Sequence, residues 1–123
     1  MNVYFISAAA VTAVICFIHC WFGGRYVAAP LLQARDLHAV PKFTNYYCWH
    51  MVSINLAVMS AAYLWAGLHA DAIELAVLAF ALSVAFCVWN LALIVWKKQQ
   101  FHQMPQWSLF AVGAIIGGLG FAV

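Results

Sequence analysis

The sequence has very few charged residues. Aspartate, glutamate, lysine and arginine make up 7% of the 123 residues, whereas 68% are hydrophobic. A water-soluble domain carries about 25% charged residues. Because so few charges cannot cover a surface that faces water, we expect most of the chain to face the lipid bilayer. The length suits one domain, and the net charge of +2 is too small to indicate a nucleic-acid partner.

Several kinds of site are also missing from the sequence. The cysteines lie in or beside apolar runs and form no C-x-x-C pair, which argues against a zinc motif or a secreted disulfide framework. There is no H-x-x-x-H pair, no glutamate cluster for a di-iron site and no glycine-rich phosphate loop. No acidic or basic residue lies at mid-depth in an apolar segment, which argues against a proton-coupled antiporter.

The chain instead contains four apolar segments separated by polar connections. A helix of about 20 apolar residues spans the roughly 30 Å hydrocarbon core of a bilayer. We expect helices at about residues 3–22, 46–68, 72–96 and 107–122. The sequence therefore predicts an all-α integral membrane protein. Its single transmembrane domain, residues 1–123, should form an antiparallel four-helix bundle.

The ends of these segments carry local signals. Gly23 and Gly24 are expected to end the first helix, because glycine commonly follows a helix terminus. Thr44 or Asn45 can cap the second helix. Asp71 followed by Glu74 predicts a capping box at the start of the third helix.

The connection over residues 25–43 has two interpretations. Aliphatic and aromatic residues are mixed there with two arginines, which is consistent with a short helix lying in the membrane interface. A plain loop with arginines reaching toward the headgroups explains the same pattern. The sequence does not decide between them.

The distribution of basic residues predicts the topology. The second connection has no lysine or arginine. All five basic residues lie in the first and third connections: Arg25, Arg35, Lys42, Lys97 and Lys98. Cytoplasmic loops are enriched in lysine and arginine. We therefore expect both termini outside the cytoplasm, with the protein integral to a bacterial inner membrane.

Small and polar residues follow one face of several segments. Gly113 and Gly117 form a G-x-x-x-G pattern, which lets another helix approach closely. That helix could belong to the same chain, or to a neighbouring copy or other membrane partner. Thr12, Ser53 and Ser83 lie on stripes that predict a polar interior, or simply tight packing with hydroxyls bonded to their own helices.

His19 and His50 form the candidate site. Each lies about one turn inside the cytoplasmic end of its segment, so adjacent antiparallel helices would bring them face to face. Imidazole nitrogens are ligands for haem iron and for copper, iron or zinc ions. The pattern therefore predicts haem b or a transition metal, with Cys16 and Cys87 as further metal ligands.

Arg25 and Arg35 complete this hypothesis, because guanidinium groups pair with haem propionates. The alternative is that both histidines are ordinary interfacial residues bonded to a carbonyl or to water. A histidine near the end of the first segment, then Trp-Phe-Gly-Gly at 21–24 and Pro-Leu-Leu at 30–32, resembles small bacterial membrane families with haem- or copper-linked roles.

Three functions remain open from the sequence. The first is a redox or metal-handling membrane protein centred on the two histidines. The second is an oligomeric module that binds or transports a small molecule. The third is an accessory subunit of a larger membrane complex. The matched depth of the histidines favours the first.

Overall fold

The computed structural model describes all 123 residues and contains only helices. Helical residues make up 85% of the chain, and there is no strand. The main elements are α1 (Val3–Ile18), the π-helical segment η1 (His19–Ala28), α2 (Ala29–Gln33), α3 (Ala39–Leu68), α4 (Ile73–Trp96) and α5 (Gln106–Leu119). Short 3-10 turns, η2 (Ala70–Ala72) and η3 (Gly120–Ala122), precede α4 and follow α5.

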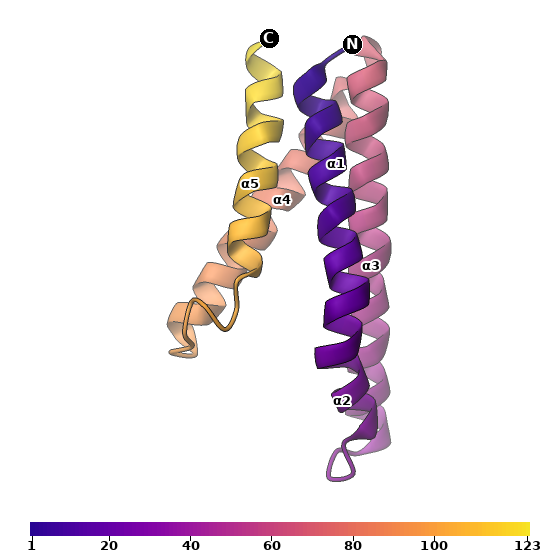
Figure 1. Ribbon diagram of the computed structural model, residues 1–123, viewed down its shortest axis with the longest axis vertical. Coiled ribbons are helices and arrows are strands. Elements are labelled where there is room, and N and C mark those ends of the chain that lie inside the picture. The colour runs from indigo at the N-terminus through magenta and orange to yellow at the C-terminus, as the bar shows by residue number, and fades with distance from the viewer.

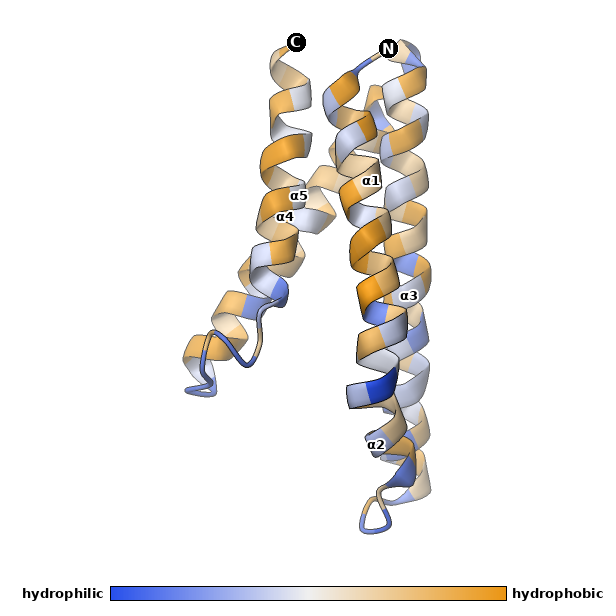
Figure 2. Cartoon of the chain, in the orientation of Figure 1, coloured by the Kyte–Doolittle hydropathy of each residue, from blue (hydrophilic) through white to orange (hydrophobic).

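Three continuous helical stretches are long and apolar enough to cross a membrane: Val3–Gln33, Ala39–Leu68 and Ala70–Trp96. The last apolar stretch, Gln106–Ala122, is shorter. These observations confirm the prediction of an all-helical chain with segments suited to a membrane. Apolar residues occur around the helices, and hydrophilic ones gather near the lower connections (Figure 2).

Figure 1 shows two helix pairs. In one pair α1 packs against α3, and in the other α5 packs against α4. The pairs meet at the end that carries both termini and move apart toward the opposite end (Figure 1). Helix α5 also contacts α1, and α4 contacts α3.

The core lies where all four long helices meet. It consists of Phe5, Ala8, Ala9, Met59, Tyr63, Ala66, Ala76 and Ala79. The alanines let the helix backbones approach closely, as small residues do between membrane helices. Only 18 of the 123 residues are buried, and large hydrophobic side chains are exposed along every span. Such a surface is suited to lipid rather than to water.

The G-x-x-x-G face of α5 has a partner within the chain. A Cβ atom on Gly117 would lie 2.9 Å from Cζ of Tyr63, so glycine makes room for the tyrosine. A Cβ atom on Gly113 would meet nothing within 4 Å. Gly117 therefore serves the contact between α5 and α3, and a contact with another subunit stays a prediction.

The first helical stretch does not end at the two glycines. It widens into a π-helix at His19 and continues through α2 to Gln33. Pro30 lies in the first turn of α2, directly after the π-helical segment. Of the two interpretations of the connection, the helical one holds up to Gln33, as a short helix continuous with the first helical stretch, and residues 34–38 form a loop.

The other predicted helix ends also shift. Helix α3 begins at Ala39, and Pro41 lies in its first turn, where proline fits. Asn45 lies inside α3 and donates from Nδ2 to the Pro41 carbonyl at 2.8 Å, so it is not the cap. At α4 the 3-10 turn η2 moves the N-cap position to Ala72, and no side-chain capping bond forms there. The predicted capping box of Asp71 and Glu74 is therefore absent.

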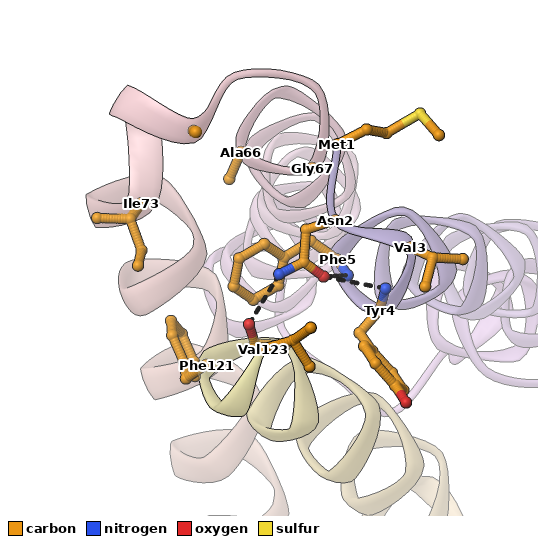
Figure 3. A pocket seen from close by; sticks show the side chains of 12 residues that line it. Met1, Asn2, Val3, Tyr4, Phe5, Ala66, Gly67, Ile73, Phe121 and Val123 are labelled. Carbon is orange, nitrogen blue, oxygen red and sulfur yellow. Dashed lines mark hydrogen bonds between the residues drawn. The ribbon is translucent and has the colours of Figure 1, made fainter.

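Asn2 joins three elements near the termini (Figure 3). Its Oδ1 accepts from the backbone N–H groups of Tyr4 and Phe5 at 3.1 and 3.2 Å, which caps α1. Its Nδ2 donates to the Gly120 carbonyl at 2.8 Å, and its backbone N–H donates to the Gly67 carbonyl at 2.7 Å. The adjoining cavity of about 400 Å³ is mostly apolar, and the amide of Asn2 is already engaged within the chain.

Candidate functional site

His19 is the first residue of the π-helical segment and contacts α3. Its Nε2 lies 3.2 Å from the backbone oxygen of Trp49. Its ring stacks on the Trp49 indole, with centroids 3.8 Å apart and planes 18° apart. The side chain is half-buried. Turns with π geometry occur frequently at functional sites, because they turn side chains out of the regular α register.

Gly23 lies against the same indole. A Cβ atom at this position would lie 2.9 Å from Cζ2 of Trp49, and even closer to Cη2. Trp49 therefore contacts both His19 and Gly23, and we call these three residues the Trp49 cluster. Glycine at position 23 makes the cluster sterically feasible.

Cys16 lies one turn before the cluster and contacts α3. Its Sγ lies 3.7 Å from the Ser53 carbonyl. Cys16 and Cys20 line an open cavity of about 420 Å³ together with Ser60. Both cysteines are free thiols.

His50 follows Trp49 on α3 but has a different environment. Its ring meets Tyr46 edge-on, with centroids 4.6 Å apart and planes 85° apart. The side chain is exposed. The structure thus places His50 beside the Trp49 cluster, with no hydrogen bond joining it to His19.

The remaining predicted site residues are more dispersed. Arg25 lies in η1, and Arg35 lies in the loop before α3; both are exposed. Cys87 is half-buried on α4, which belongs to the other helix pair. No group of three or more histidine, cysteine, aspartate or glutamate side chains could hold a metal ion. The four predicted metal ligands therefore do not converge as a set.

Most polar side chains inside the helices are bonded to backbone. Thr12 and Ser83 donate to carbonyls four residues earlier, at 2.8 and 2.9 Å. Asn90 accepts from the Trp107 N–H at 3.0 Å and so joins α4 to α5. These bonds favour tight packing of the polar stripes over the alternative of a polar interior.

His69 repeats part of the arrangement at the opposite end of α3. It stacks on Trp65 at 4.1 Å, and its Nδ1 lies 3.1 Å from the Trp65 carbonyl. Because Trp65 and His69 both lie at the C-terminal end of α3, their contact does not join two helices. His69 is therefore a matched control for His19.

One polar residue escaped the sequence analysis. Asn55 lies in the middle of the apolar part of α3 and is exposed. A single amide within a long apolar run is visible in the sequence, but only the structure shows that it faces outward.

Comparison with protein families, curated proteins and solved structures finds no match. The function must therefore be argued from the residues of this chain.

Proposed function

We propose that the protein binds a haem b group, or a transition-metal ion, at His19 and His50 and serves a redox or metal-handling role. The supporting observation is that two imidazoles from packed helices occur at the same end of the molecule, each with an unbonded ring nitrogen. His19 uses Nε2 toward the Trp49 carbonyl, which leaves Nδ1. His50 contacts Tyr46 through its ring alone.

The number of available ligands favours haem within this proposal. Structural zinc sites take four ligands, and catalytic zinc sites take three protein ligands. No group of three suitable side chains converges here. Haem iron needs at most two axial ligands from the protein, which the two histidines supply.

Basic residues near His19 and His50 also support a haem site at this end of the molecule. Arg25 lies in η1, six positions after His19, and is exposed. Lys42 donates to the Ala34 carbonyl and so ties the loop that carries Arg35 to the start of α3. Guanidinium groups here would pair with propionates at the membrane surface.

The proposal includes a placement in the membrane. The chain forms an antiparallel four-helix bundle in a bacterial inner membrane, with both termini outside the cytoplasm. Its support is that all five basic residues lie in η1, in the loop before α3, in the first turn of α3 or directly after α4. These segments lie at the end of the molecule opposite the termini (Figure 1). Asp71 and Glu74 lie at the same end of the molecule as the two termini. The candidate site then faces the cytoplasmic side.

The deciding experiment is an absorption spectrum of the protein purified in mild detergent, before and after reduction, with elemental analysis of the same sample. We expect a Soret band that shifts on reduction. His19→Ala and His50→Ala should lose it, whereas His69→Ala should keep it. Metal without a Soret band would instead support an ion site and bring Cys16 and Cys87 into consideration.

Two results would overturn the proposal. One is equal cofactor binding by all three histidine variants. The other is a colourless, metal-free protein that does not take up added haemin. Either result would leave the histidines as interfacial residues and favour a binding module or an accessory subunit.

A further inference from the structure

The middle of α3 presents an unpaired amide to its surroundings. Asn55 is exposed, nine positions after Tyr46 and thirteen before Leu68. At 1.5 Å rise per residue, Asn55 lies about 14 Å from Tyr46 and about 20 Å from Leu68 along the helix axis. It is therefore near mid-depth if the segment from Tyr46 to Leu68 spans the membrane. The other three asparagines, Asn2, Asn45 and Asn90, all make side-chain hydrogen bonds within the chain. Asn55 makes none.

At this depth the Asn55 amide has no water to bond to, and no group of its own chain bonds to it. Burying such a group without a hydrogen bond is unfavourable, and polar residues in membrane helices commonly bond across to another helix. Asn55 therefore calls for a partner that offers both a donor and an acceptor at the same depth.

The residues around Asn55 follow a heptad. Positions alternate by three and four along one face of α3: Cys48, Met51, Asn55, Val58, Ala62 and Trp65. Cys48, Met51, Asn55, Val58 and Trp65 are exposed, whereas Ala62 is half-buried and packs against the core of its own chain. We call this face the Asn55 stripe. The two serines that lie toward α1, Ser53 and Ser60, are not part of it.

The surface of the stripe is hollowed at Asn55. Met51, Ile54, Asn55 and Val58 line a shallow depression of about 280 Å³. These positions are i, i+3, i+4 and i+7 of one helix, which is the set that forms a hole for a side chain of a facing helix. The geometry is thus suited to a second helix rather than to a small ligand.

We propose that two copies of this chain pair through the Asn55 stripe, α3 against α3. Both copies have the same orientation in the membrane, so a twofold axis along the membrane normal makes the two α3 helices parallel. Identical residues then face each other. A primary amide carries both donor and acceptor, so Asn55 of one copy satisfies Asn55 of the other. A single asparagine in such a seam also fixes register and oligomeric state.

Native cysteines provide a test. In the parallel pair, Cys48 lies one heptad before Asn55 and faces Cys48 of the second copy. Cys20 is also exposed but lies on η1, beside Ala57 and Ser60 of α3, which are not part of the stripe. Mild oxidation of the protein in liposomes should give a dimer that reductant reverses. Cys20→Ser should still form it, and Cys48→Ser should not.

A second measurement is energy transfer between labelled copies in liposomes over a range of protein-to-lipid ratios. Asn55→Leu should weaken association about three- to thirtyfold, the range for one hydrogen bond between membrane helices. Asn55→Gln should restore part of the loss, because it keeps the amide. Val77→Leu, at an exposed position on α4, should associate as the wild type does.

The inference is overturned if the wild type stays monomeric at every ratio. It is also overturned if Cys48→Ser crosslinks as well as the wild type, or if Asn55→Leu associates equally well. These readouts do not use the absorption spectrum, so they stand apart from the cofactor proposal.

Discussion

The indole of Trp49 covers Gly23 so closely that a Cβ atom on the glycine would lie 2.9 Å from indole Cζ2. A neighbour at that distance must shift, and here the neighbour is a large ring that also stacks on His19. Gly23 is therefore part of what holds α3 against the first helical stretch at the histidine end.

We expect Gly23→Ala to destabilise the protein by about 1–3 kcal/mol through overpacking against Trp49. Gly24→Ala is the matched control, because a Cβ atom there meets nothing within 4 Å. Both variants gain the higher helix propensity of alanine over glycine, which is up to about 1 kcal/mol. The difference in stability between the two variants therefore measures the contact with Trp49. Thermal unfolding in detergent measures it. Equal melting temperatures for the two variants would show that Trp49 moves aside without cost.

A second prediction concerns the contact between α5 and α3. Gly117→Ala should lower stability by about 1–3 kcal/mol, because the added methyl group would overlap the ring of Tyr63. Gly113→Ala should be neutral or slightly stabilising, since nothing lies within 4 Å of its Cβ position. Thermal unfolding and size-exclusion chromatography measure the two effects. A loss of oligomer in Gly113→Ala would contradict the intrachain interpretation and indicate a subunit contact.

The sequence predicted the helical class well because hydropathy is a local property. Apolar runs of sufficient length identify membrane helices without any knowledge of packing. The end of the first helix was not predictable in this way. Gly23 commonly marks a helix terminus, yet here it lies within a π-helical segment and faces Trp49, which is 26 positions away.

The candidate site was predictable only in part. The contact of His19 with the backbone of Trp49 agrees with the expectation that the first two apolar segments are neighbours. The direction of His50 depends on the rotation of α3, which no local pattern specifies. Asn55 was visible as an amide, but its outward orientation also depends on that rotation.

The last prediction concerns the end of the molecule where the helix pairs meet. Asn2→Ala would remove the N-cap of α1 and the bond from Nδ2 to the Gly120 carbonyl. The cap alone contributes about 0.5–2 kcal/mol, and the bond to Gly120 adds about 0.5–1.5 kcal/mol. Asn45→Ala is the control, because its bond to the Pro41 carbonyl stays within one exposed turn of α3. Thermal unfolding in detergent should therefore show a clear loss for Asn2→Ala and little change for Asn45→Ala. Equal loss in both would mean that the terminal junction contributes no more than a local turn. A loss confined to Asn2→Ala would show that one side chain helps to hold α1 and the end of α5 together.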